Sequence, residues 1–215
     1  MRNLLLTLTL LLAIANARAN PFLREFPAGG KLEITLEDKL KLAAYSWPRT
    51  LLAYNVDFRA AKVPAGELQL RDEISKHDIP FQLSVVRTNA DGTLRFAVVN
   101  FLADLPSGGE RRFALSHGRP MDFPAGVKGI AAGNSFVLDA GKLQVRVPAS
   151  RQFVTGEKIP GPILALNRGN GWIGDSQMVS SNRTVKSVTT ERIEAGPLFI
   201  IARVTYQFSG GGVYA

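Results

Sequence analysis

The residues best suited to binding chemistry lie in one glycine-rich loop, residues 167–172, whose sequence is NRGNGW. An exposed indole such as that of Trp172 can stack on the face of a sugar ring. Arg168 and Asn170 can hydrogen-bond sugar hydroxyls or a carboxylate. We therefore predict binding residues at Trp172, Arg168 and Asn170, with a polysaccharide or acidic glycan as the partner. The competing interpretation, and the commoner role of a tryptophan, is that Trp172 fills the core beneath the loop.

Three other aromatic residues admit the same two interpretations. Trp47 lies between Tyr45 and Tyr54 in a region of predicted strands. Core packing is the favoured interpretation for all three.

Residues for catalysis or metal binding are not grouped in this sequence. The two histidines, His77 and His117, lie far apart in predicted loops, with no serine elbow or carboxylate pattern nearby. Glu191 and Glu194 lie on one predicted strand at an odd spacing, which would place them on opposite faces and make a poor acid/base pair. The glycines beside Asn170 lack the lysine and following helix of a phosphate-binding loop. We therefore name no catalytic residue, no metal ligand and no cofactor.

Composition and charge narrow the classes of protein further. The chain has no cysteine, which excludes disulfides, zinc–thiolate sites and a cysteine nucleophile, and fits a bacterial exported protein. Its net charge of +8 is spread along the chain without a basic block or interleaved aromatics. This pattern argues against nucleic-acid binding, and it is compatible with a basic groove for an acidic polysaccharide.

The N-terminus has the pattern of an export signal. Arg2 precedes an apolar run of 11 residues, Leu4–Ile14, and small residues at Ala17 and Ala19 mark a cleavage point after Ala19. The run is shorter than the roughly 20 apolar residues of a transmembrane helix. We predict a cleaved signal peptide at residues 1–19, hence a secreted or periplasmic bacterial protein with no membrane span after cleavage. A buried core helix is the alternative.

The stretch Ile79–Phe101 predicts the central hairpin of the fold. Two apolar β-type runs flank a turn at residues 89–92, and both faces of the second run are largely apolar, as in a central strand. A second hairpin is predicted over Ser135–Val147, and two long strands over Thr184–Phe208 around a turn at residues 194–197.

Shorter strands are predicted at Lys31–Leu36, Leu51–Phe58, Glu67–Leu70 and Phe113–Leu115, and irregular loops at Pro120–Asn134 and Val154–Asp175. Leu40–Tyr45 is a strand or helical turn that ends at Trp47-Pro48, because the residue before proline avoids the helical region. We predict an all-β fold over residues 20–215, an antiparallel β-sandwich or distorted barrel of about 10–12 strands. A subdomain boundary, if one exists, lies near residues 120–134.

The last residues predict a strand that is only begun. Residues 208–212 form a turn that should feed a partner strand starting at Val213–Ala215. A long apolar strand without its neighbour exposes unpaired backbone groups, which natural proteins avoid. We therefore expect the chain to be a fragment truncated at its C-terminal end, the alternative being a short natural C-terminal strand.

Several short motifs resemble the N-terminal β-domain of exo-rhamnogalacturonan-lyase-like secreted proteins, which has the pattern P-x-Q, DGS-x-RW and a-x-L-p-x-G. The matching residues are Pro80-Phe81-Gln82, Asp91-Gly92-Thr93-Leu94-Arg95-Phe96 and Ala103-Asp104-Leu105-Pro106-Ser107-Gly108. Glu194–Leu198 followed by Arg203–Tyr206 resembles a later strand pair of that domain. Phe96 replaces the family's tryptophan and Thr93 its serine. The likeness covers roughly Asn55–Ala215.

The resemblance implies a secreted, non-catalytic β-domain that begins a larger polysaccharide-degrading protein. In that family the lyase chemistry is attributed to a following helical toroid domain, so no catalytic residue is carried over and no activity is expected of this chain alone. The missing C-terminal domain of the same protein is then an expected partner. The alternatives are a stand-alone secreted carbohydrate-binding or adhesion-type module, and a purely structural domain.

Overall fold

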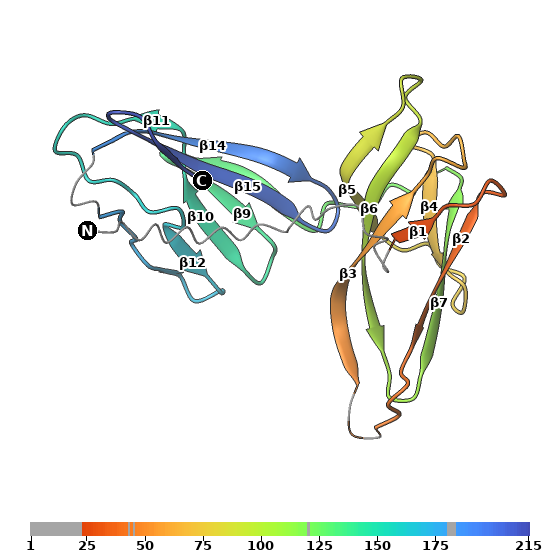
Figure 1. The fold of residues 1–215 in the computed structure, drawn as a ribbon. Helices are drawn as coiled ribbons and strands as arrows, with labels where there is room; N and C mark the ends of the chain where they lie inside the picture. Colours follow the sequence, from red (N-terminus) through yellow and green to blue (C-terminus); the bar gives the residue numbers. More distant parts are fainter. Residues whose placement is uncertain (1–22, 43, 45, 120, 180–183) are drawn as a thin grey trace, which may run out of the picture.

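The computed structural model describes residues 23–42, 44, 46–119, 121–179 and 184–215. These residues form sixteen β-strands and no helix, in four sheets (Figure 1). The strands pair antiparallel, apart from the parallel pair β1 and β3. The prediction of an all-β fold is confirmed, and because no sheet in the described part closes into a barrel, the sandwich is the correct one of its two forms. The predicted signal at residues 1–19 lies outside the described residues.

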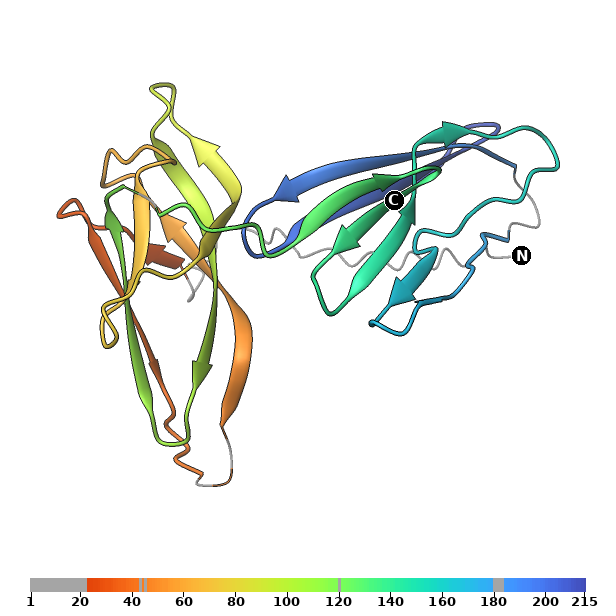
Figure 2. The same cartoon turned by 180° about the vertical axis from the view of Figure 1, so that it is seen from behind.

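The N-terminal lobe, residues 23–119, consists of two sheets packed face to face (Figures 1 and 2). The first has the order β1 (Leu23–Glu25), β3 (Trp47–Asp57), β6 (Leu94–Leu105), β5 (Phe81–Thr88). The second has the order β2 (Lys31–Glu37), β7 (Glu110–His117), β4 (Leu68–Asp72). Their inner faces meet in one apolar core, where the ring of Phe101 lies 5.0 Å from that of Phe113 on the opposite sheet and 5.8 Å from that of Tyr54.

The C-terminal lobe, residues 121–215, carries the other two sheets. One has the order β13 (Trp172–Ile173), β12 (Ala165–Asn167), β10 (Gln144–Pro148), β9 (Ser135–Asp139), β8 (Lys128–Ala132). The other has the order β11 (Arg151–Gln152), β14 (Val185–Ala195), β15 (Ile200–Phe208), β16 (Val213–Tyr214). A small core surrounds Tyr206, whose buried hydroxyl donates to the Pro160 carbonyl at 2.8 Å and whose pKa is raised to about 12 by burial.

The hairpins and long strands lie where alternation predicted them. Ile79–Phe101 contains β5 and β6, Ser135–Val147 contains β9 and β10, and Thr184–Phe208 contains β14 and β15. The return strand is also present, because β16 pairs with β15 through Tyr206 and Tyr214.

Three local predictions are wrong. The loop expected over Pro120–Asn134 contains β8, and the loop expected over Val154–Asp175 contains β12 and β13. The strand predicted from Leu51 starts earlier: β3 begins at Trp47 and accommodates Pro48, which has no N–H to donate, in a bulge. Leu40–Leu42 is not a strand, and Tyr45 lies outside the described residues.

Residues 118–127 connect β7 to β8 and thus join the two lobes. The subdomain boundary predicted near residues 120–134 overlaps this segment and stays a prediction.

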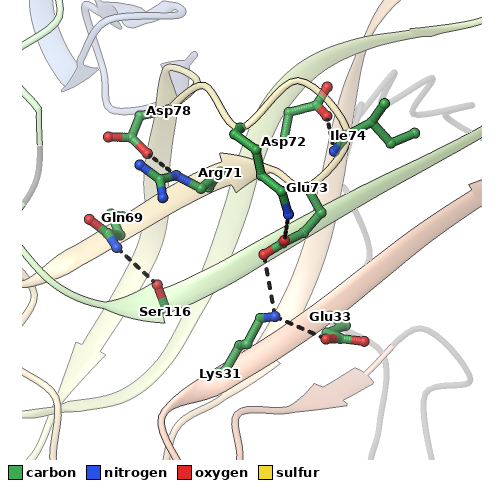
Figure 3. Close-up of polar contacts among 10 residues, drawn as sticks. Lys31, Glu33, Gln69, Arg71, Asp72, Glu73, Ile74, Asp78 and Ser116 are labelled. Atoms are coloured by element: carbon green, nitrogen blue, oxygen red, sulfur yellow. Dashed lines mark hydrogen bonds and ion pairs between the residues drawn. The ribbon is translucent and has the colours of Figure 1, made fainter.

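Asp72, at the end of β4, is a buried carboxylate with three donors. Its oxygens accept from the backbone N–H groups of Ile74 (2.9 Å, Figure 3) and Ser75 (3.0 Å) and from Arg111 Nη2 (3.0 Å). Burial acts to raise the pKa of Asp72, but these hydrogen bonds and the Arg111 charge outweigh it and hold the pKa below its ordinary value. Asp72 therefore stabilises the fold only while it is ionised.

We predict that Asp72→Asn lowers the free energy of unfolding by about 1 kcal/mol at pH 7. At this pH Asp72 is ionised, and its hydrogen bonds are stronger than those of the neutral asparagine amide. The stability that Asp72 supplies is fully present above about pH 4 and is lost as the pH falls through its lowered folded-state pKa. The variant should therefore lose less stability than the parent between pH 6 and pH 3, measured from urea unfolding midpoints. Asp122→Asn, at an exposed carboxylate, is the matched control. Parallel pH curves for Asp72→Asn and the parent would contradict the assignment.

Candidate binding face

Trp172 lies on β13, the edge strand of the five-stranded sheet, and is half-buried. The guanidinium carbon of Arg146 lies 3.9 Å from the centre of its ring, so the cation covers one indole face. Trp172 is therefore neither buried in the core nor fully exposed for stacking. Together with Arg146 it forms an indole–guanidinium pair at the surface.

The turn beside Trp172 is held from within by Asn167. Its side-chain oxygen accepts the backbone N–H groups of Gly169 at 2.8 Å and Gly171 at 3.2 Å. Both glycines have positive φ, 98° and 100°, which other residues adopt only with strain. The other two predicted binding residues, Arg168 and Asn170, lie exposed in this turn, so the structure brings all three together at one edge of the sheet.

A row of polar side chains crosses the same sheet. The strand register sets five residues side by side, one from each strand: Lys128, Asp139, Gln144, Asn167 and Trp172. Directly opposed residues of antiparallel strands share one face. We call these five residues the polar row, and each is at least partly exposed.

Hydrogen bonds run along the polar row. Gln144 Nε2 donates to Asp139 Oδ2 at 3.0 Å, and Asn167 Nδ2 donates to Gln144 Oε1 at 2.9 Å. The backbone N–H of Gly141, then Gln144 and the charge of Lys128, hold the pKa of Asp139 below its ordinary value. The middle of the row is thus a fixed chain of hydrogen bonds between the Lys128 end and the Trp172 end.

Arg146 belongs to the same face, because it lies two residues beyond Gln144 on β10. Its Nε is screened from solvent and has no hydrogen-bond partner among the described residues. The face therefore offers cationic and amide donors beside an indole, a set that suits hydroxyl and carboxylate groups.

Two other surfaces differ in character. On the outer face of β2, β7 and β4, charged groups pair with one another around a cleft of about 370 Å³: Lys31 lies 3.1 Å from Glu33 and 3.3 Å from Glu73 (Figure 3). Trp47, 48% exposed, lines a cleft of about 500 Å³ between the N-terminal sheets, so its predicted core role is wrong, whereas Tyr54 packs in the core as predicted.

The two glutamates of β14 lie differently from the prediction. Glu191 pairs with Arg203 and Glu194 with Ile201, two residues apart on β15, because a bulge lies between Arg192 and Glu194. The two carboxylates therefore share a face, which corrects the expectation of opposite faces. His117 Nε2 lies within hydrogen-bond distance of Glu67 Oε2, at 2.7 Å. The described residues contain no group of three or more histidine or acidic side chains placed to hold a metal ion.

Sequence reasoning missed Arg146 and most of the polar row. The alternation Gln-Val-Arg-Val at residues 144–147 does place Gln144 and Arg146 on one face. The pairing of that face with Asn167 and Trp172 depends on β12 and β13, which were not predicted.

No family model matches the chain, and a comparison with curated proteins also found no match. Within the described residues, no helix has the length and apolarity needed to cross a membrane.

We predict that Asn167→Leu, which removes both the acceptor in the turn and the donor to Gln144, loosens the Trp172 edge. The expected cost is about 1–2 kcal/mol of unfolding free energy, and Trp172 fluorescence should shift to longer wavelength as the indole gains solvent. The measurement uses a Trp47→Phe background so that Trp172 is the one tryptophan. Asn167→Asp keeps the acceptor for the turn and should lose less. Unchanged stability and emission in Asn167→Leu would show that the turn does not depend on this side chain.

Proposed function

We propose that this chain is the non-catalytic β-domain of an exported polysaccharide-degrading protein, and that it binds an acidic polysaccharide. The observation that carries the proposal is the Arg146–Trp172 pair at the end of the polar row, 3.9 Å from guanidinium carbon to ring centre. The lyase-like chemistry of the parent protein would lie in another domain.

The pair favours an acidic ligand over a neutral one. Because Arg146 covers one face of the indole, a sugar ring stacking on that face would first have to displace the cation. A carboxylate can instead approach the guanidinium, whose planar donors match two carboxylate oxygens. Arg168, exposed in the adjoining turn, supplies a second cation near the same edge.

The polar row also favours an extended ligand. It crosses five strands, and neighbouring strands lie about 4.8 Å apart, so its ends are about 19 Å apart. Lys128 lies at one end and the Arg146–Trp172 pair at the other. A polymer with repeated carboxylates could contact both ends, whereas a single sugar could contact one.

Three features of the sequence support the proposal. The motifs at residues 80–82, 91–96, 103–108 and 194–198 resemble the β-domain of secreted lyase-like proteins. The signal-like residues 1–19 support export to the periplasm or the medium. Residues 1–19 contribute two arginines and no acid to the net charge of +8, so the exported part carries 8 − 2 = +6, which would attract a polyanion from a distance at low salt.

We predict that the purified chain binds polygalacturonic acid and not a neutral dextran, and that Trp172→Ala weakens this binding about tenfold, or about 1.4 kcal/mol. Calorimetry or affinity electrophoresis measures both. Arg146→Ala should weaken binding similarly, and Arg146→Lys less, because it keeps the charge but loses the planar fork. Trp47→Ala, at the half-exposed tryptophan of the other lobe, is the matched control and should bind as the parent does.

Salt supplies a second check on the same proposal. Binding should weaken between 50 mM and 500 mM sodium chloride, since exposed charges are screened over a shorter distance at higher ionic strength. Equal binding of dextran and polygalacturonic acid, or loss of binding in Trp47→Ala with Trp172→Ala unaffected, would overturn the assignment.

A further inference from the structure

Three polar side chains are buried on the outward face of the β1–β3–β6–β5 sheet. Gln82 and Asn100 are each 5% exposed, and Ser84 is 8% exposed. Val99 and Phe101 point into the core, so alternation along β6 places Asn100 on the opposite face. Asn100 Nδ2 donates to the backbone carbonyl of Gln82 at 3.0 Å and to Ser84 Oγ at 2.9 Å. Polar groups buried on an outer face indicate that another part of the chain covers them.

The covering part is the turn between β14 and β15, which reaches β5 from the other lobe (Figures 1 and 2). The side-chain oxygen of Gln82 accepts the backbone N–H groups of Leu198 at 3.2 Å and Phe199 at 3.1 Å. A Cβ at Gly196 would lie 2.5 Å from Gln82 Cδ, so the contact requires glycine there. Gln82 thus fits against the turn in both shape and hydrogen bonding.

The same turn holds the connection between the lobes. The Gly126 N–H, in the segment 118–127, donates to the Pro197 carbonyl at 2.8 Å. A Cβ at Gly126 would lie 2.6 Å from that carbonyl oxygen. The turn between β14 and β15 therefore contacts two parts of the chain. The residues on either side of Pro197 contact Gln82 of β5, and the Pro197 carbonyl contacts the connecting segment.

A third contact is made by Glu194, at the start of the turn. Its Oε1 accepts the Val85 N–H at 3.3 Å, while its Oε2 is screened from solvent and has no hydrogen-bond partner in the part of the chain that the structure describes. Val85 has a φ of 51°, a left-handed conformation that is strained for a β-branched residue, at a bulge of the edge strand β5. Such strain persists where surrounding contacts hold it, and the Glu194 contact is one of them.

We propose that Gln82 and the turn Glu194–Phe199 form an interlobe clasp, which fixes the angle between the lobes and couples their unfolding. Gln82 is the central member, because its side-chain oxygen accepts two backbone N–H groups of the turn. The proposal concerns the relative placement of the lobes and is independent of the glycan binding proposed above.

The absence of cysteine makes a distance measurement direct. Spin labels on cysteines introduced at the exposed turn residues Ala90, in the N-terminal lobe, and Lys142, in the C-terminal lobe, report the distance between the lobes. The parent should give one narrow distance distribution by pulsed electron spin resonance. Gln82→Leu should broaden it, because leucine fills a similar volume without an acceptor. Gln82→Glu, made in the parent chain, should keep the narrow distribution, since a carboxylate oxygen can accept the same two N–H groups.

Two further variants keep the test decisive. Gly196→Ala should broaden the distribution without touching Gln82 itself, and it serves in place of Gln82→Leu if that variant does not fold. Gln69→Leu, at a glutamine of β4 that donates to Ser116 Oγ at 3.3 Å, is the matched control and should leave the distribution narrow.

Coupled unfolding has its own readout, since Trp47 reports the N-terminal lobe and Trp172 the C-terminal lobe. In Trp47→Phe and Trp172→Phe backgrounds, the two urea transitions should coincide in the parent and separate when Gln82→Leu or Gly196→Ala is added. A narrow distribution together with coincident transitions in both clasp variants would overturn the proposal.

Discussion

The relative placement of the two lobes depends on one buried carboxamide. The oxygen of Gln82 accepts two backbone N–H groups from a turn more than a hundred residues later. Each of those N–H groups would cost about 1–3 kcal/mol if buried without an acceptor. The turn could therefore lie against β5 only with Gln82, or a similar acceptor, in place.

The short motifs that resemble the lyase-like family lie in turns or at the contact between the two lobes. Residues 80–82 and 194–198, which resemble separate parts of one pattern, face each other across the clasp. In the turn after β5, Asp91 Oδ1 accepts the Thr93 N–H at 3.0 Å and Gly92 has a φ of 81°. In the turn after β6, the Gly108 N–H donates to Asp38 at 2.8 Å. These residues determine turns and a junction, and the family resemblance stays a proposal. The case for binding rests on the five-stranded sheet that carries Trp172.

The fold was predictable where strands are long and the binding face was not. Alternation over eight to twelve residues located β5 and β6, and the turn residues located the hairpins. β12 and β13 are three and two residues long, too short to show a period, so the sequence predicts an irregular loop around Trp172. Residue type alone predicts Trp172, Arg168 and Asn170 as binding residues. Arg146 and the polar row need cross-strand register, and Glu194 needs the bulge at Ile193, neither of which a single sequence contains.

The internal hydrogen bonds of the polar row determine which of its groups remain for a ligand. Asp139, Gln144 and Asn167 satisfy one another and the neighbouring turns, so their capacity for new hydrogen bonds is reduced and their side chains are held in place. Lys128, directly opposite Asp139 on the neighbouring strand, and Arg146, whose guanidinium covers the Trp172 ring, supply cations towards opposite ends of the row. The row is therefore best regarded as a rigid spacer between two cationic ends. Since the spacing is set by the sheet rather than by flexible loops, a ligand gains from both ends only if its own charges are similarly spaced.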